Sequence, residues 1–375
     1  MSSEKRKLER NPDKREWAFM AYIAGDNNLS DAGLEDIEEL CQEGASDKVH
    51  VGVEIDTYGE HTGSIRYEIT KSDYTGTAHR VVLERLPEKD SGDPESLRSF
   101  MDWGFHRFCA DKTLTVIWNH GAGFRLPRRD IGIDDFGSSL DMPEIEGVFK
   151  RAGLGGDNKI EVLGFDACLM NMVEIAHHFK DFARVVVGSE QTEPGDGWPY
   201  DKVLKAMKES ADGSELGTKI VREYITSYKD IGVYGVTQSA IDLAKTDEVV
   251  KALSDLGALL AANISKFGPK VKDIRRRIQS FEYADYVDLI HAANGISSTV
   301  NDPQVTTACK TLVQCAEACV ISSETYGDSV QNAHGLSVWF PPRADLYDNY
   351  RAKYMCLKAP TSYPGWVDFL DAYHT

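Results

Sequence analysis

Strand-like and helix-like segments alternate through the first half of this 375-residue sequence, and this alternation constrains the fold more than any other feature. Apolar, strand-like runs occupy residues 17–25, 49–57, 112–123, 159–168 and 183–193. Segments with apolar residues at helical spacing separate them, at residues 26–44, 93–111, 142–153 and 171–182. Such runs are typical of parallel strands covered on both faces. The sequence therefore predicts a doubly wound α/β fold, in which functional residues gather at the carboxyl ends of the strands.

The pattern changes along the chain. Residues 63–73 and 77–87 alternate polar with apolar residues and predict an antiparallel hairpin at a sheet edge. After about residue 230 the alternation loosens, with a strand-like segment at 232–243, a single amphipathic helix at 247–267 and a short strand at 335–341. We therefore predict an α/β domain at residues 12–245 and a smaller, more helical domain at residues 246–375.

Charge and hydropathy limit the partners that this chain is expected to bind. The 42 basic and 60 acidic residues give a formal charge of −18, which repels phosphate backbones and makes nucleic acid an unsuitable partner. No run of eighteen apolar residues is present, and the amino-terminal segment is charged where a signal peptide is apolar. We expect no membrane partner and a cytoplasmic location.

The seven cysteines support the same expectation, since they are odd in number, widely scattered and without a zinc-ribbon spacing. Cys309, Cys315 and Cys319 lie near helical spacing and are interpreted as small packing residues.

Two strand ends carry residues suited to nucleophilic catalysis. "VIWNHGAG" brings His120 into a glycine-rich loop, and "LGFDACLM" brings Cys168 to the expected start of a helix. A nucleophilic cysteine needs a lowered pKa, which a helix amino terminus or a nearby imidazole can provide. Adjacent strand ends would supply both. The alternative is that Cys168 is a packing residue and His120 a structural one.

Acidic residues surround this candidate centre. Asp166 precedes the cysteine by two residues and shares its side of the strand end, so it is either a buried anion serving a pocket or a helix N-cap. A third strand end, "SEQTEPGDGWPY", carries Ser189, Glu190, Glu193 and Trp198. This segment is either a substrate-binding loop or a solvated acidic loop.

Seven motifs occur in an order that resembles the clostripain-like cysteine peptidases of the caspase-fold clan: "YIAGDNNLS", "WNHGAGF", "IGIDDF", "GFDACLMNMVEIA", "SEQTEPGDGWPY", "SAIDL" and "GLSVWFP". The resemblance spans nearly the whole chain. It implies a caspase-like three-layer αβα sandwich with a mostly parallel sheet. It also implies a catalytic dyad on His120 and Cys168, a primary specificity carboxylate on Asp166 and cleavage after Arg or Lys.

The same resemblance implies, for some relatives, calcium dependence and maturation by a cut between the two catalytic residues. We expect no other cofactor, and "DDF" and the acidic loops are too generic to place a calcium site. One departure is that Ala122, Gly123 and Phe124 follow "HG", where the family usually has a small residue, glycine and tryptophan. The aromatic ring is kept, but the indole donor is lost.

The resulting hypothesis is a cysteine endopeptidase in which Cys168 attacks the carbonyl after a basic residue and His120 protonates the departing amine. Backbone N–H groups of Gly121 and Cys168 are expected to hold the oxyanion. The expected substrate-binding residues are Asp166, Ser189, Glu190 and Trp198. Candidates for self-cleavage are Arg125, Arg128 and Arg129, with Lys150 and Arg151 as less suitable sites because they end a predicted helix. The alternatives are a non-catalytic binding or regulatory module and a cysteine-dependent amidase.

Overall fold

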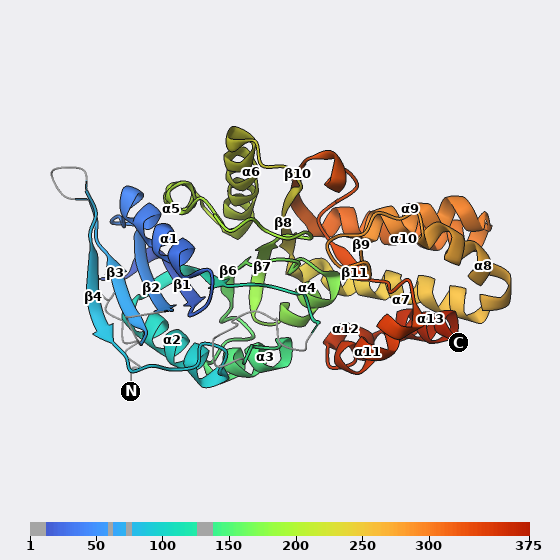
Figure 1. Ribbon diagram of the computed structural model, residues 1–375, viewed down its shortest axis with the longest axis horizontal. Coiled ribbons are helices and arrows are strands. Elements are labelled where there is room, and N and C mark those ends of the chain that lie inside the picture. The colour runs from blue at the N-terminus through green and yellow to red at the C-terminus, as the bar shows by residue number, and fades with distance from the viewer. Residues whose placement is uncertain (1–12, 59–62, 73–76, 126–137) are drawn as a thin grey trace, which may run out of the picture.

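A nine-stranded sheet forms the centre of the α/β part of the molecule (Figure 1). The computed structural model describes residues 13–58, 63–72, 77–125 and 138–375. Along the sheet the strand order is β10-β8-β7-β6-β5-β1-β2-β3-β4. The strands are β1 (Arg15–Gly25), β2 (Val49–Thr57), β3 (Ile65–Ile69), β4 (Arg80–Arg85), β5 (Ala110–Trp118), β6 (Ile160–Asp166), β7 (Ala183–Gly188), β8 (Val236–Asp242) and β10 (Val320–Tyr326).

The five central strands, β7-β6-β5-β1-β2, are parallel. Antiparallel pairs flank them on both sides, and β3 and β4 form the predicted edge hairpin. The central strands are mostly buried because helices cover both of their faces.

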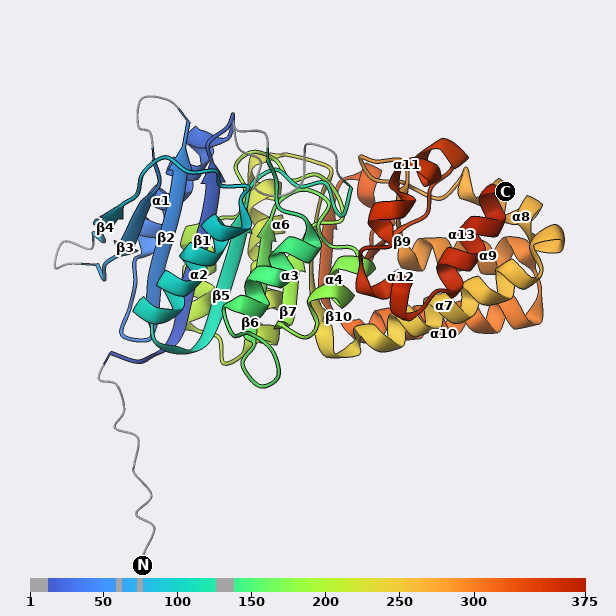
Figure 2. The same cartoon turned by 90° about the horizontal axis from the view of Figure 1, so that it is seen from below.

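Helices form a layer on each face of the sheet, and Figure 2 shows one of these layers in front of the strands. One layer contains α1 (Ser30–Glu43), α5 (Tyr200–Lys208) and α6 (Gly213–Ile231); the other contains α2 (Pro94–Arg107), α3 (Met142–Arg151) and α4 (Val173–Phe179). Each layer packs on its own buried apolar cluster. The predicted three-layer αβα sandwich is therefore confirmed.

Local capping explains where two of these helices begin. Asp93 accepts a hydrogen bond from the Glu95 N–H at the start of α2, where Pro94 cannot donate one. Asp141 and Glu144 form a reciprocal capping box at the start of α3. Helices were predicted from apolar spacing at residues 93–111 and 142–153, and α2 and α3 begin within one residue of these predicted starts.

The C-terminal part is mainly helical, as predicted, and lies at one end of the sheet beyond β10 (Figure 1). Its helices are α7 (Thr246–Ala262), α8 (Ile264–Arg275), α9 (Leu289–Val300), α10 (Pro303–Cys319), α11 (Ala344–Tyr354), α12 (Lys358–Ser362) and α13 (Gly365–His374). Two short strands, β9 (Tyr286–Asp288) and β11 (Ser337–Trp339), pair antiparallel, and single 3-10 turns occur at Leu243–Lys245 and Asp328–Val330.

The single helix predicted at residues 247–267 is wrong. The helix is interrupted at Asn263, which has non-helical backbone angles and whose Nδ2 donates a hydrogen bond to the Leu259 carbonyl. Side chains that bind the backbone in this way compete with the helical ladder, and apolar periodicity alone does not reveal the competition.

The boundary at residue 245 stays a prediction. α7 begins at Thr246, but β10 comes from the C-terminal half and pairs with β8 in the large sheet. Cys309 and Cys319 are buried in α10 and Cys315 is half-buried there, which confirms their interpretation as packing residues. Among the described residues, no helix is both long enough and apolar enough to cross a membrane.

Candidate active site

Parallel strand pairing brings His120 and Cys168 to one edge of the sheet. Trp118 of β5 is paired with Asp166 of β6, and the Asn119 N–H extends this ladder by donating to the Asp166 carbonyl at 3.3 Å. His120 and Cys168 each lie two residues beyond this pair. Because neighbouring strands are about 4.8 Å apart, these two positions are brought close together, and both residues line one pocket.

The backbone at Gly121 lies directly against the cysteine. A Cβ atom at this position would come within 2.3 Å of the Cys168 carbonyl oxygen and 2.8 Å of its nitrogen. No side chain fits there, so only glycine allows the two strand ends to approach. The N–H groups of Gly121 and Cys168, which we expect to hold the oxyanion, therefore belong to backbone segments in contact.

Cys168 does not lie at the start of a helix, and this part of the prediction is wrong. α4 begins five residues later, after an N-cap at Met172. The intervening backbone instead pairs with the segment after β7, where the Leu169 N–H donates to the Gln191 carbonyl at 3.0 Å. Leu169 has a φ of 64°, an uncommon conformation for a leucine that turns the chain sharply after the thiol.

The Cys168 thiol is half-buried beneath the segment that follows β7. The Glu193 N–H donates to Sγ at 3.2 Å. Burial raises the pKa of the Cys168 thiol, and hydrogen bonds from the backbone of Glu193 and Gly121 oppose this rise. The lowered thiol pKa that the sequence predicts is therefore wrong for this arrangement. A protonated thiol needs a base before it can attack a carbonyl.

His120 is the residue for which the sequence predicts this role, and its side chain lines the same pocket as Cys168. Its Nε2 lies 2.9 Å from Asn28 Oδ1, in the loop that follows β1. The Asn119 side chain accepts a hydrogen bond from the His120 N–H and donates to the Ala24 carbonyl. Three adjacent strand ends, those of β1, β5 and β6, thus position the imidazole and the thiol. Asn28 lies within the "YIAGDNNLS" motif, where the residue pattern alone did not indicate a role for it.

Asp166 lies at the base of the site, with 4% of its surface exposed. Its Oδ2 accepts hydrogen bonds from the Tyr200 hydroxyl at 2.7 Å and from the Trp198 N–H at 3.2 Å. Burial raises the pKa of Asp166 to about 6, and these hydrogen bonds limit the rise. The alternative role as a helix N-cap is wrong, because α4 has its own N-cap at Met172.

Two further carboxyl groups lie close to Asp166. The pKa of Glu193 is raised well above its usual range by burial and by the charge of Asp166. The pKa of Asp36, on α1, is raised for the same two reasons. In the part of the chain that the structure describes, no Lys, Arg or His forms an ion pair with any of these three carboxyl groups. The site therefore contains three acidic groups without a described cationic partner, and the raised pKa values of Glu193 and Asp36 favour their protonated forms.

A pocket of about 110 Å³ opens between the thiol and these acids. Its wall includes His120, Asp166, Cys168, Glu193 and Gly197. The backbone at Gly197 has a φ of 58° and approaches Asp166 so closely that an added Cβ would lie 3.0 Å from Oδ2. The pocket has acidic side chains in its wall and opens beside Cys168.

The other predicted binding residues lie outside this pocket wall. Ser189 and Glu190 are buried, and they bond to the Thr237 hydroxyl at 2.8 Å and the Gly335 N–H at 2.8 Å respectively. Trp198 is fully buried, but its backbone and its indole N–H donate to Asp166 and Glu193. Ser189 and Glu190 thus position the segment that carries Glu193, while Trp198 orients the two acids.

Phe124 does not reach the pocket. It is buried in an aromatic cluster, with ring centroids 5.9 Å from Tyr286, 5.4 Å from Trp339 and 5.2 Å from Tyr354. The loss of the indole donor at this position therefore changes the packing between the loop after His120 and the C-terminal part. It does not alter the pocket wall.

No group of three His, Cys, Asp or Glu side chains in the described ranges could hold a metal ion. The "DDF" sequence at residues 134–136 lies outside those ranges, as do Arg128 and Arg129. Calcium dependence therefore stays a prediction.

Comparisons with known proteins agree with this geometry. A family model described as "Clostripain family" matches residues 21–373. Clostripain from Hathewaya histolytica is 25% identical over 428 residues, which cover 94% of this chain and 79% of that protein. A secreted cysteine protease from Bacteroides thetaiotaomicron, solved in complex with an irreversible peptide inhibitor, has a TM-score of 0.73 at 19% identity and covers 92% of this chain and 98% of its own. An inactive zymogen protease from Parabacteroides distasonis has a TM-score of 0.73 at 18% identity, covering 94% and 99%.

Proposed function

Because the chain belongs to the clostripain family and is a cysteine-type peptidase, we propose that His120 and Cys168 form its catalytic dyad and that it cleaves peptide bonds after Arg or Lys. One observation supports this most strongly. The register between β5 and β6 brings His120 and Cys168 to the same edge of the sheet, and both line a pocket whose acids form no ion pair with any described Lys, Arg or His.

The chemistry follows from these positions. His120 accepts the thiol proton as Cys168 Sγ attacks the substrate carbonyl, and the imidazolium then protonates the departing amine. Water hydrolyses the resulting thioester, with His120 acting again as the base. Backbone N–H groups of Gly121 and Cys168 stabilise the oxyanion, and each such donor contributes roughly 10² to 10³ in rate in comparable enzymes.

The acids at the base of the pocket account for the proposed specificity. An arginine or lysine side chain entering past Cys168 brings its charge to Asp166, which already accepts two hydrogen bonds that orient it. Charge-assisted hydrogen bonds to a carboxylate are about twice as strong as neutral ones. Burial and the charge of Asp166 raise the pKa of Glu193. A cation bound beside Glu193 lowers this pKa, so Glu193 then gives up its proton more readily.

A panel of fluorogenic peptides that differ only in the residue before the cleaved bond tests this function. We expect kcat/KM for Arg and Lys peptides to exceed that for Leu and Asp peptides by at least about 10²-fold, since an unmatched buried charge costs several kcal/mol. Cys168→Ala serves as the blank. Equal turnover of all four peptides would contradict the specificity, and full turnover by Cys168→Ala would contradict the dyad.

We also propose that the protein processes itself after Arg128 or Arg129. The other basic candidates are held in place by side-chain contacts or by helical hydrogen bonds. Arg125 donates to Asp285 at 2.8 Å and its guanidinium lies 4.3 Å and 4.0 Å from the rings of Tyr283 and Tyr350. Lys150 and Arg151 end α3, so their backbone is held in helical hydrogen bonds. The sequence around Arg128 and Arg129 contains Pro127 and Gly132, which favour the exposed, extended backbone that a protease needs.

Incubation of the purified wild type beside Cys168→Ala, followed by sequencing of the fragment amino termini, tests this prediction. We expect a new terminus at Arg129 or Asp130 in the wild type alone. Fragments in both samples would indicate a contaminating protease. A single intact chain with full peptidase activity would show that the protein works without self-cleavage.

A further inference from the structure

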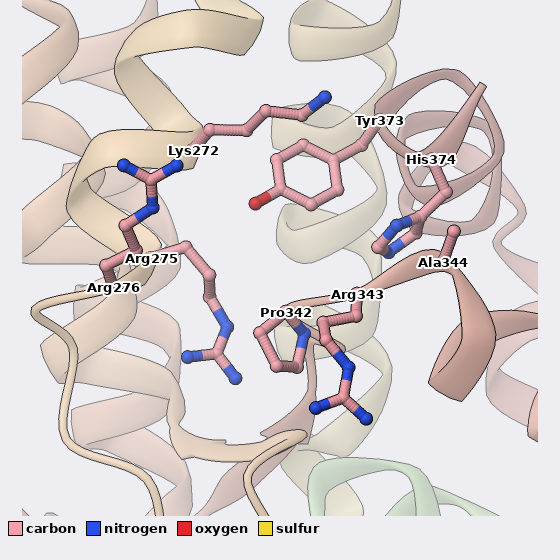
Figure 3. Close-up of a pocket in the computed structure, with 8 residues that line it drawn as sticks. All are labelled: Lys272, Arg275, Arg276, Pro342, Arg343, Ala344, Tyr373 and His374. Carbon is pink, nitrogen blue, oxygen red and sulfur yellow. The ribbon is translucent and has the colours of Figure 1, made fainter.

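A second pocket, of about 180 Å³, lies among the C-terminal helices (Figures 1 and 3). Its residues are far in the sequence from β5 and β6, the strands that precede His120 and Cys168. Three segments form its wall: the C-terminal end of α8, the loop that precedes α11, and the end of α13. Figure 3 shows their side chains around a common space. The charged and polar members are Lys272, Arg275, Arg276, Arg343, Tyr373 and His374. We call this cavity the basic pocket.

The basic pocket concentrates positive charge in a protein whose formal charge is −18. Only Arg343 has a carboxylate partner among the described residues, since both its Nε and Nη2 donate to Asp345. Lys272, Arg275 and Arg276 form no ion pair with any described carboxylate. Three cationic groups thus line one cavity without an ion-pair partner, although like charges at short range repel each other. Asp285 attracts Arg275 only beyond ion-pair distance and is itself paired with Arg125.

Arg275 is the buried member of this group, with 4% of its surface exposed. Its Nε donates to the Phe340 carbonyl at 2.7 Å and its Nη2 donates to the Ala284 carbonyl. These bonds fix the plane of the guanidinium, while no described acceptor engages Nη1. Burial of an arginine without a carboxylate is costly unless a ligand supplies the missing charge.

His374 provides an independent observation. Its Nε2 is buried, and no hydrogen-bond partner for it is found among the described residues. Burial and the charges of Lys272 and Arg275 lower the pKa of His374 to about 4, so the imidazole is neutral at physiological pH. The carboxylate of Asp348 opposes this shift without reaching ion-pair distance. A ring nitrogen without a partner, next to an arginine with a spare donor, indicates an absent polar ligand.

We propose that the basic pocket binds a phosphate group, either free inorganic phosphate or the phosphate of a small ester. A phosphate is a compact dianion with several acceptor oxygens, and it can accept from the Arg275 Nη1, Arg276 and Lys272 donors at once. The Tyr373 hydroxyl, which also lines the cavity, adds a neutral donor. The protein's overall negative charge repels anions at long range, so the recognition depends on these local contacts.

Calorimetric titration of the full-length protein with inorganic phosphate and with glycerol 3-phosphate tests the proposal and distinguishes the two sources by their relative affinity. We expect Lys272→Gln and Arg276→Gln each to weaken binding by about ten-fold, since each removes one charge-assisted hydrogen bond. Both side chains are exposed, so neither substitution disturbs the core. We also expect phosphate to raise the Tm of the wild type, with an increase that continues with the logarithm of its concentration above Kd.

Arg277→Gln is the matched control, because it removes the same charge from the position next to Arg276. Arg277 lies outside the pocket wall and pairs with Asp273 at 2.5 Å. Unchanged affinity in this variant, together with the losses above, supports a specific site. Equal weakening by Arg276→Gln and Arg277→Gln would show only general electrostatic attraction and would overturn the proposal. Absence of binding and of thermal stabilisation at millimolar phosphate would overturn it as well.

Discussion

Asp166→Asn is expected to lower kcat/KM for Arg and Lys peptides by about 10² to 10³-fold, because loss of one partner from a buried ion pair typically costs 3–5 kcal/mol. The substitution keeps the shape of the side chain. Its amide oxygen can still accept from the Tyr200 hydroxyl and the Trp198 N–H, which now donate to Oδ2. Alkylation of Cys168 by iodoacetamide is expected to continue at the wild-type rate, since this neutral reagent does not use the carboxylate.

The same variant is expected to have a higher Tm than the wild type at pH 7.5. Burial raises the pKa of Asp166 to about 6 from an ordinary value of 3.8, so the folded protein holds a proton that the unfolded chain releases. The stability of the wild type therefore falls as the pH rises through this window, and above pH 6 the charged group is a net cost. Asparagine removes this cost. Lost activity with lower stability would instead indicate damaged packing.

The wild-type pH profile gives a further test of the same group. In the free enzyme, kcat/KM for Arg peptides is expected to fall as the pH drops through about 6, because a protonated Asp166 no longer attracts a cation. The exposed Asp157→Asn is the control, since it removes one negative charge far from the pocket wall. An Asp166→Asn variant that retains full activity on Arg peptides would contradict the assignment of this carboxylate to specificity.

The order of strands and helices in the α/β part was predictable because each element is encoded by local signals. Continuous apolar runs predict covered strands, and apolar residues at helical spacing predict α2 and α3. The edge hairpin followed from alternation in the same way. The break between α7 and α8 was not predictable from periodicity, because apolar spacing continues across Asn263 while its side chain ends the helical ladder.

The return of β10 to the large sheet also escaped prediction. Its seven residues follow α10 directly and pair with β8, nearly eighty residues earlier in the chain. Every residue of β10 is only partly buried, so the strand lacks the apolar run that identified the central strands. Pairing between distant segments is decided by tertiary contacts, which a single sequence does not contain.

At the site, the positions of His120, Cys168 and Asp166 were predictable because parallel register is almost fixed once two strands are adjacent. The direction of the Cys168 pKa shift and the presence of further acids beside Asp166 were not predictable. Burial of the thiol beneath Glu193, and the presence of Asp36 beside Asp166, depend on how α1 and the segment after β7 fold over the strand ends. These contacts join segments that are far apart in the sequence, and they reverse the expected direction of the Cys168 pKa shift.

The raised pKa of the Cys168 thiol makes a base important for its activation. His120→Ala is expected to lower kcat at pH 7.5 by about 10² to 10⁴-fold, the usual contribution of a positioned general acid–base. The loss arises because burial raises the pKa of the Cys168 thiol, so that without the imidazole the nucleophile stays protonated. Hydroxide can remove that proton instead. The residual activity of the variant is therefore expected to rise continuously with pH, through and beyond the ordinary thiol range, whereas the wild type reaches a plateau.

The matched control is His106→Ala, an exposed histidine on α2 that lies outside the pocket wall, and its kcat and pH profile are expected to equal those of the wild type. The shape of the profile distinguishes a base from a structural residue. A histidine that merely supported the loop would, when removed, lower activity by the same factor at every pH. Such a parallel loss would contradict the dyad. Recovery at high pH would show that hydroxide can replace His120, and therefore that His120 normally takes the proton from the buried thiol.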